Sequence, residues 1–165
     1  MKIAVAGLGY VGLSGAILLA QHNEVVAVDI DAARVAQVNA RKSPIVDPDI
    51  DDFLANHDLN LTATTDAAAA FQGADYIIVA TPTNYDTQHD YFDTSSVETV
   101  IEQALAQNDT AQIVIKSTIP VGFTQRMRAR TGSDRIMFSP EFLREGRALH
   151  DNLHPSRIIV GATTP

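Results

Sequence analysis

The stretch Gly7-Leu8-Gly9-Tyr10-Val11-Gly12 decides the fold, because it separates two apolar runs of different periodicity. Before it, Lys2–Ala6 (KIAVA) predicts a buried strand, and from Tyr10 onward apolar residues recur at helical spacing. A strand that becomes a helix over three glycines is typical of a dinucleotide site. Gly7 permits the tight turn, Gly9 lets a pyrophosphate approach the backbone, and Gly12 lets the helix pack closely on the strand. The free N–H groups at the start of the helix then face the anion.

A carboxylate follows this turn at the distance that the dinucleotide motif requires. Residues 24–29 (EVVAVD) predict a second apolar strand, and Asp29 at its end can accept hydrogen bonds from the adenosine ribose hydroxyls. The alternative is an ordinary glycine-rich turn, since a lone GxGxxG is weak evidence. The strand, the helix and the acid together favour the dinucleotide. Because a carboxylate repels a 2′-phosphate, we expect NAD rather than NADP.

The rest of the chain continues to alternate strands with helices. Further strands are predicted over residues 59–64, 75–80, 112–116, 135–138 and 157–161. Helices are predicted over residues 33–40, 51–56, 95–107 and 123–130, with Asp31, Asp66 and Thr94 as N-caps and an alanine-rich turn after Asp66. Residues 41–50 and 85–93 are expected to be loops. The alternation predicts one α/β domain with a doubly wound, mostly parallel sheet of the Rossmann type.

Polar residues follow three of the predicted strands. In a doubly wound sheet the loops at the carboxyl ends of the strands form the ligand crevice, so Thr83 and Thr118 are candidates for it. Glu141 and Glu145 follow a third strand and could line the same crevice. The alternatives are a proline turn with a capping threonine at Thr83, and a solvated helical turn for the two glutamates.

Arginines on two of the predicted helices are more ambiguous. Arg34 lies in the first turn of its helix and could reach the adenosine end of a dinucleotide, or it could be a solvated helix charge. On residues 123–130 we expect a solvated face, made by Arg126, Arg128 and Arg130.

Composition excludes several classes of partner. With 165 residues, 45% of them hydrophobic, and a net charge of −8, the chain suits a globular core and argues against nucleic acid or an anionic membrane as a general partner. No apolar run reaches the ~20 residues of a membrane span. No signal-peptide pattern precedes the first strand, so we expect a cytoplasmic protein.

The chain contains no cysteine, which excludes a disulfide, a thiolate metal site and a thiol nucleophile within it. Three Asp and one His in residues 85–93 could suggest a metal site. Their spacing meets no ligand rule, and loop carboxylates are usually solvated, so no metal is predicted.

Four segments together resemble the nucleotide-sugar dehydrogenases, the family of UDP-glucose and GDP-mannose dehydrogenases. They are IAVAGLGYVGL at residues 3–13, TPTN at 81–84, KSTIPVGFT at 116–124 and SPEFLREGRALHDNLHPSRIIVG at 139–161. The glycine motif is shared by many dehydrogenases, whereas the last block is distinctive. Its final part is more similar to the UDP-glucose branch of the family. The resemblance covers the whole chain.

The resemblance implies a set of site residues. It implies NAD contacts at Tyr10, Val11, Asp29, Arg34, Thr83, Thr118 and Glu145. It implies that the sugar nucleotide, UDP-glucose in the branch that this chain resembles more closely, touches Glu141, Phe142, Leu143, Arg144 and Glu145. Glu141 would act as a general base or water-orienting group, and Thr118 would help to position the water.

The family oxidises a sugar C6 alcohol to a carboxylate in two hydride transfers to two NAD molecules, through a cysteine-bound thiohemiacetal and thioester. Residues 1–165 hold no cysteine, so we expect them to be the NAD-binding domain of a longer enzyme and inactive alone. The resemblance implies that a central helix, a carboxyl-terminal sugar-nucleotide domain and a homodimer belong to the full-length protein. A GDP-mannose dehydrogenase and a non-catalytic dinucleotide-sensing module are the alternative interpretations.

Overall fold

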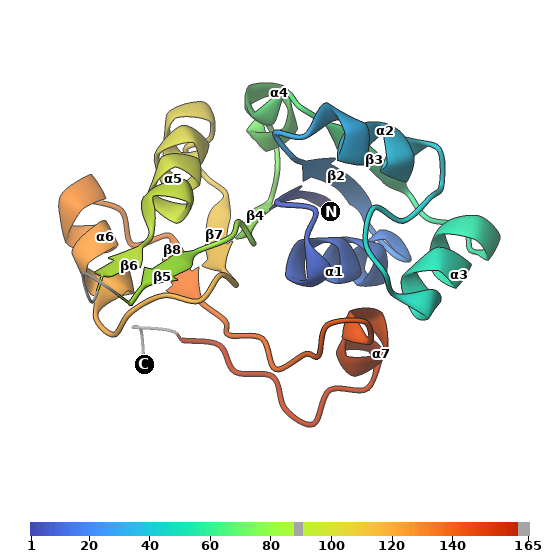
Figure 1. Cartoon of the computed structure of the whole chain (residues 1–165). Helices are drawn as coiled ribbons and strands as arrows, with labels where there is room; N and C mark the ends of the chain where they lie inside the picture. The colour runs from blue at the N-terminus through green and yellow to red at the C-terminus, as the bar shows by residue number, and fades with distance from the viewer. Residues whose placement is uncertain (88–90, 162–165) are drawn as a thin grey trace.

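A six-stranded parallel sheet forms the centre of the computed structural model, which describes residues 1–87 and 91–161 (Figure 1). The strand order is β3-β2-β1-β4-β7-β8, and every neighbouring pair is parallel. The bounds are β1 (Lys2–Ala6), β2 (Glu24–Val28), β3 (Leu61–Thr64), β4 (Tyr76–Val79), β7 (Gln112–Ile115) and β8 (Ile136–Phe138). The order reverses direction between β1 and β4, which is the arrangement of a doubly wound dinucleotide-binding sheet. The predicted fold class is confirmed.

Helices cover both faces of this sheet. They are α1 (Tyr10–Ala20), α2 (Ala32–Asn39), α3 (Pro48–Asn56), α4 (Ala67–Phe71), α5 (Ser95–Gln107), α6 (Phe123–Thr131) and α7 (Ala148–Leu153). One apolar core joins the sheet to α1, α2, α3 and α7, and the other joins it to α4, α5 and α6. Alternate residues of β1 point into the two cores, with Ile3 and Val5 in the first and Ala4 and Ala6 in the second. Both faces are therefore buried, as the continuous apolar strands predict.

Several predicted elements differ from the observed ones. Asp47 is the N-cap of α3, so the helix begins within the predicted loop of residues 41–50. The predicted loop of residues 85–93 contains a short antiparallel hairpin, β5 (Asn84–Asp86) with β6 (Tyr91–Asp93). Helix α7 was not predicted. Residues 157–160 form no strand, and Gly161 makes one isolated antiparallel bridge to Phe138 instead.

Two local predictions on α5 and α6 are confirmed only in part. Thr94 occupies the N-cap position of α5, but its hydroxyl donates to Glu98 Oε1 at 2.8 Å rather than capping a backbone group. Arg128 Nε donates to the Ile136 carbonyl at 2.7 Å, and Arg130 pairs with Glu98 and Glu102 of α5. The expectation of a solvated arginine face holds for Arg126 and Arg130, which are exposed, but it is incomplete, since Arg128 and Arg130 also tie α6 to β8 and to α5.

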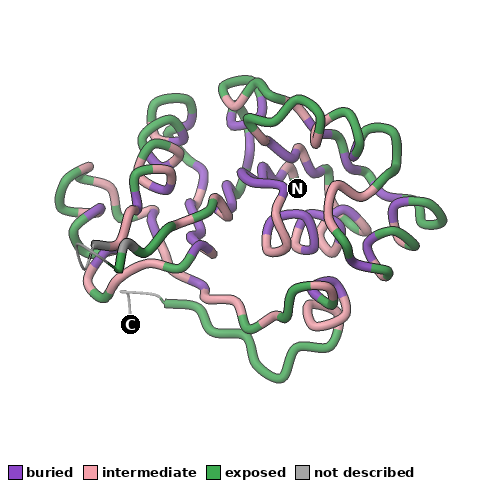
Figure 2. The backbone as a smooth tube through the Cα atoms, in the orientation of Figure 1, coloured by how far each residue is buried: buried purple, intermediate pink, exposed green. Residues whose placement is uncertain are grey.

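The chain after β8 follows a separate path. Residues 139–147 are irregular, α7 packs against α1, and residues 154–160 run back toward β8 (Figure 1). Figure 2 shows that this returning segment is exposed, whereas the sheet strands are largely buried. Across residues 1–87 and 91–161, no helix has the length and apolarity to cross a membrane.

Candidate functional site

The glycine turn packs more tightly than side chains would allow at two positions. Gly7 has a φ of +103°, and a Cβ there would lie 2.5 Å from the Ala80 carbonyl oxygen. A Cβ on Gly12 would lie 1.8 Å from the Gly7 carbonyl oxygen. The backbone roles expected of these two glycines, a tight turn and a close approach of helix to strand, are confirmed.

Gly9 differs from both, since a Cβ built on it meets nothing within 4 Å. It is the N-cap of α1, and no side chain caps the helix there. Its carbonyl accepts the first helical bond, from the Leu13 N–H at 2.9 Å, so the N–H groups of Tyr10, Val11 and Gly12 precede the helical ladder. Open space beside unfilled N–H donors at the positive end of an eleven-residue helix fits a pyrophosphate.

Asp29 links the end of β2 to this turn. Its Oδ2 accepts from the Leu8 N–H at 2.8 Å and its Oδ1 from the Asp31 N–H at 2.9 Å. Arg34, in the first turn of α2, lies with Nε 3.7 Å from Asp31 Oδ2, while Asp31 caps that helix as predicted. Asp29 therefore helps to shape the turn as well as facing the cleft described next.

One cleft of about 640 Å³ opens over the carboxyl ends of β1, β4 and β7. It brings together most of the site residues predicted from the sequence, namely Gly7, Gly9, Tyr10, Val11, Asp29, Arg34, Thr83, Thr118, Glu141, Leu143 and Glu145. Gly12 lies buried beneath the turn, and Phe142 and Arg144 line a different pocket. We call this space the cofactor cleft.

Hydrogen bonds between loops position the two threonines of the cleft. Ser96 Oγ of α5 donates to the Pro82 carbonyl at 2.6 Å, and Ser117 Oγ donates to the Thr81 carbonyl at 2.7 Å. The loop that carries Thr83 is thus tied to α5 and to the loop that carries Thr118. Thr83 is half-buried and Thr118 is exposed, so both hydroxyls can meet a ligand.

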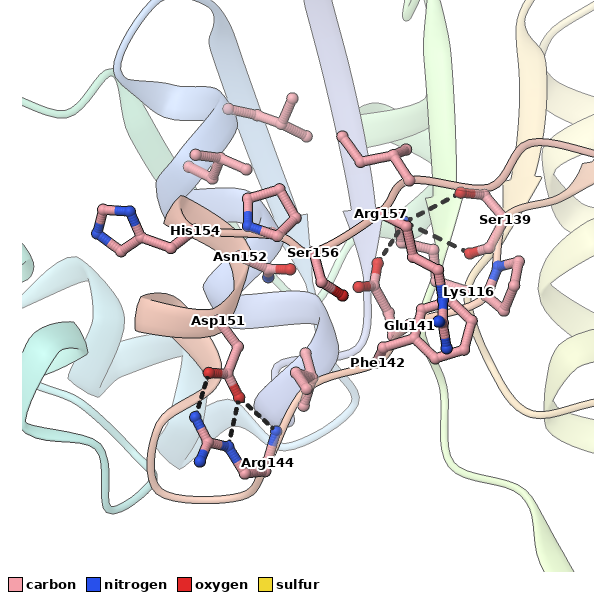
Figure 3. A pocket seen from close by; sticks show the side chains of 17 residues that line it. Lys116, Ser139, Glu141, Phe142, Arg144, Asp151, Asn152, His154, Ser156 and Arg157 are labelled. Carbon is pink, nitrogen blue, oxygen red and sulfur yellow. Dashed lines mark hydrogen bonds and ion pairs between the residues drawn. The ribbon is translucent and has the colours of Figure 1, made fainter.

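A second pocket, of about 360 Å³, lies between residues 139–144 and the returning segment (Figure 3). It is lined by Phe142, Arg144, Asp151, His154 and Arg157 among others. Lys116, Pro140, Glu141 and Leu143 line both this pocket and the cofactor cleft. The two spaces therefore meet at these four residues.

Lys116 is a site residue that the sequence analysis missed. It follows β7 directly, and its ammonium group pairs with Glu141 Oε1 and lies 3.4 Å from the Ser139 carbonyl oxygen (Figure 3). The signal was available, because Lys116 stands at a strand carboxyl end just before Thr118. The alternative of a solvated helical turn at Glu141 is wrong, since residues 139–146 are not helical and the Glu141 side chain is only 16% exposed.

Buried and ionic contacts hold the segment that carries Glu141. The fully buried Asp47 accepts from the Asp49 and Ile50 N–H groups with Oδ1, and from the Ala148 and Leu149 N–H groups with Oδ2. One carboxylate thus caps both α3 and α7. The Asn152 side chain donates to Ser14 Oγ at 2.8 Å, which fastens α7 to α1.

An ion pair closes the turn between Glu141 and α7. The Arg144 guanidinium donates to both oxygens of Asp151, at 3.0 and 2.7 Å, and the Arg144 N–H donates at 3.0 Å. The hydrogen bonds from the Arg144 side chain and backbone hold the pKa of Asp151 well below its usual range. Nearby, the Arg157 guanidinium lies 4.2 Å over the ring of Phe142, which is 50% exposed. Arg144 and Phe142 therefore face the second pocket instead of the cofactor cleft.

In the described parts of the chain, no group of three His, Cys, Asp or Glu side chains is placed to hold a metal ion. His89 and Asp90, which belong to the weighed metal-site alternative, lie outside the described residues.

Comparisons with known proteins agree with this geometry. The family model described as "UDP-glucose/GDP-mannose dehydrogenase family, NAD binding domain" matches residues 1–165. A UDP-glucose 6-dehydrogenase of Streptococcus pneumoniae is 56% identical over 161 residues, 98% of this chain and 41% of the relative. One of Campylobacter jejuni is 45% identical over 163 residues, 98% of this chain and 42% of the relative.

Solved structures with similar folds include a ternary complex of GDP-mannose dehydrogenase from Pseudomonas aeruginosa, with a TM-score of 0.85 at 27% identity over 98% of this chain and 41% of that one. A UDP-glucose dehydrogenase from Pyrobaculum islandicum gives a TM-score of 0.84 at 28% identity, over 98% of this chain and 40% of that one. The chain thus spans about two fifths of the length of the proteins that it matches.

Proposed function

The chain belongs to the UDP-glucose/GDP-mannose dehydrogenase family, and on that premise we propose that it is the NAD-binding part of a UDP-glucose 6-dehydrogenase. The full-length protein would oxidise UDP-glucose to UDP-glucuronate with two NAD molecules. Residues 1–165 would form the cofactor half of that enzyme, and the remaining residues would supply a central helix, a sugar-nucleotide domain and a homodimer contact.

One observation supports this proposal most strongly: the glycine turn, Asp29 and Glu141 line a single cleft that meets a second pocket at Glu141. The turn has donors and open space for a pyrophosphate at one end. The other end reaches a carboxylate that also lines the second pocket. A dinucleotide laid from the turn toward Glu141 would present its far end to a molecule in that pocket.

The residues suggest how the reaction would proceed. NAD, when bound, would accept a hydride from the C6 carbon of the sugar. The N–H groups at the start of α1 would hold its pyrophosphate, and Asp29 would accept hydrogen bonds from its adenosine ribose. The Thr83 and Thr118 hydroxyls can donate or accept at the nicotinamide end. Glu141 would accept a proton from, or orient, the attacking water, and Thr118 would help to hold that water.

The sugar nucleotide is the finer part of the proposal. Identity of 56% to a UDP-glucose 6-dehydrogenase favours UDP-glucose. Structural similarity to a GDP-mannose dehydrogenase supports GDP-mannose as the alternative. Specificity for the sugar and base would depend largely on residues outside this chain.

Two measurements test the proposal. Calorimetric titration should show NAD binding to residues 1–165. These residues should produce no NADH from UDP-glucose, because the proposed sugar-nucleotide domain is not part of them and they contain no thiol to form the thioester. The full-length protein should release two NADH per UDP-glucose and far fewer with GDP-mannose. NAD binding without turnover of any nucleotide sugar by the full-length protein would favour a dinucleotide sensor. NADH production by residues 1–165 would refute the proposal that they form only the cofactor half of the enzyme.

A further inference from the structure

We propose that Lys116 is a positioning residue for Glu141, holding its carboxylate at the junction of the cofactor cleft and the second pocket. The inference rests on the proposed function, in which Glu141 serves the reaction as a base.

Lys116 is anchored to the sheet, whereas Glu141 is not. The Lys116 N–H donates to the Val79 carbonyl at 2.8 Å, and the preceding Ile115 is fully buried and paired with Phe138 of β8. Glu141 lies three residues beyond the end of β8, in a stretch without helical or strand hydrogen bonds. A carboxylate on such a stretch needs a partner on a rigid element to be held in place.

The ammonium group of Lys116 directs all its contacts to this segment. Its Nζ pairs with Glu141 Oε1 and lies 3.4 Å from the Ser139 carbonyl oxygen and 3.3 Å from Ser139 Oγ (Figure 3). Three acceptors match the three N–H donors of an ammonium group. Within residues 1–87 and 91–161 these acceptors occupy the ammonium donors, so Lys116 would act through Glu141 rather than on the reacting atoms.

The burial of the pair makes it more than a surface contact. The Lys116 side chain is 23% exposed and that of Glu141 is 16% exposed. Exposed ion pairs contribute little, because water screens the charges and the side chains remain free to move. Partial burial strengthens the attraction and restricts the rotamers of both residues.

The other ionisable groups around the pair explain why a cation is needed here. On the second-pocket side, Arg144 and Asp151 bind each other, and the remaining ionisable side chains are His154 and Arg157. On the cofactor side they are Tyr10, Asp29, Arg34 and Glu145. A bound pyrophosphate would add negative charge to a cleft that already holds three carboxylates. Lys116 offsets the charge of Glu141, which is one of these three carboxylates.

The test is a double-mutant cycle in the full-length protein, measuring kcat for UDP-glucose oxidation and the Kd of NAD. Lys116→Met removes the charge from a chain of similar length, Lys116→Arg keeps it, and Glu141→Gln removes the carboxylate. The exposed Lys42, which lines neither pocket, provides the matched control Lys42→Met.

We expect Lys116→Met to lower kcat about tenfold to a hundredfold, as the loss of a hydrogen bond to a charged group predicts. The Kd of NAD should change less than about twofold, and Lys116→Arg should recover part of kcat.

The cycle decides whether Lys116 acts through Glu141. If it does, the double variant Lys116→Met, Glu141→Gln should be no slower than Glu141→Gln alone. Effects that multiply would overturn the proposal, as would a Kd of NAD that rises in step with the loss of kcat. If the wild type is active but the two substitutions lower kcat independently, only the role of Lys116 is refuted. If the wild type does not oxidise UDP-glucose, the proposed function is refuted and the role of Lys116 with it.

Discussion

The glycine turn and the segment after β8 (residues 139–152) both contribute residues to the cofactor cleft, yet they are built differently. The turn joins consecutive elements, β1 and α1, and its shape follows from glycine backbone geometry at Gly7 and Gly12. The segment after β8 is mostly irregular and is held by side chains from distant parts of the chain. Asp47 reaches the Ala148 N–H across 101 residues of sequence, and Lys116 reaches Glu141 from a neighbouring strand.

The two regions would serve different steps, with cofactor binding at the glycine turn and chemistry at the segment after β8. Backbone N–H groups can hold a pyrophosphate with no side chain at all, so local geometry is enough at the turn. A base must have one carboxylate at one place, and an irregular backbone cannot provide that without long-range partners. Substitutions at the turn should therefore affect binding, and substitutions at the segment after β8 should affect chemistry or local order.

Glu141→Gln in the full-length protein should have the largest effect. Gln has nearly the same shape but cannot accept the proton, so the rate should fall about 10²–10⁴-fold. If Glu141 serves the hydrolytic step, a covalent intermediate should accumulate on the cysteine that the family resemblance implies for the full-length protein. Mass spectrometry after mixing with UDP-glucose and NAD would detect the adduct. The control is Glu24→Gln, because Glu24 is exposed and begins β2, at the edge of the sheet away from the cofactor cleft. Normal turnover without an adduct would remove Glu141 from the mechanism.

Gly9→Val should abolish NAD binding in a folded protein, a loss of more than about 100-fold in Kd. The new side chain would meet no protein atom near its Cβ, but it would fill the space expected for the pyrophosphate. As a poorer N-cap than glycine, valine should cost only about 1 kcal/mol of stability. Calorimetry and thermal melting measure the two effects.

Gly12→Val is the matched contrast, because its Cβ would collide with the Gly7 carbonyl and unfold the domain. Unchanged NAD affinity in folded Gly9→Val protein would show that the turn is not the phosphate site.

The same contrast explains which parts of the structure were predictable from sequence. Most sheet strands appear in the sequence as continuous apolar runs, and the glycine turn appears as a motif of fixed spacing, so a single sequence displays both. The six-residue α7 and the three-residue strands β5 and β6 are too short to show a period. The apolar run at residues 157–160 predicted a strand, but only Gly161 bridges to β8, and a strand exists only where its backbone finds a partner.

The site residues also differ in how far they could be predicted from the sequence. Gly7, Gly9 and Asp29 were predictable because their spacing alone defines a motif. The position of Lys116 at a strand carboxyl end was also readable, but its pairing with Glu141 was not, and neither was the contact of Asp47 with α7, because both partners lie far along the chain. Sequence reasoning finds residues that act through local geometry more readily than residues that act through a distant partner.

Asp47→Asn should loosen the segment after β8 while the glycine turn keeps its structure. An amide can replace one of the two carboxylate oxygens, so the bonds to either α3 or α7 are lost. The free energy of unfolding should fall by about 2–3 kcal/mol. Hydrogen exchange at Ala148 and Leu149 should accelerate, with exchange at Leu8 changing only as much as global stability does. Asp49→Asn, in the first turn of α3, should cost about 0.3–1 kcal/mol. Equal loss of protection at both ends of the cleft would contradict the independence of the two regions.

Asp29→Asn should produce the smallest effect. The carboxylate faces the cofactor cleft while accepting from Leu8 and Asp31, so it combines a structural role with the expected preference for NAD. Asn retains one acceptor oxygen but no longer repels a 2′-phosphate, and Arg34 in the same cleft can then attract it. The ratio of NADP to NAD dissociation constants should fall about tenfold, which corresponds to roughly 1.4 kcal/mol. Calorimetric titration of both cofactors measures it. Asp66→Asn, at the N-cap of α4, should leave the ratio unchanged, because Asn caps a helix as well as Asp does and Asp66 does not line the cleft. Wild-type protein that binds NADP as tightly as NAD would refute the assignment of Asp29 to the ribose.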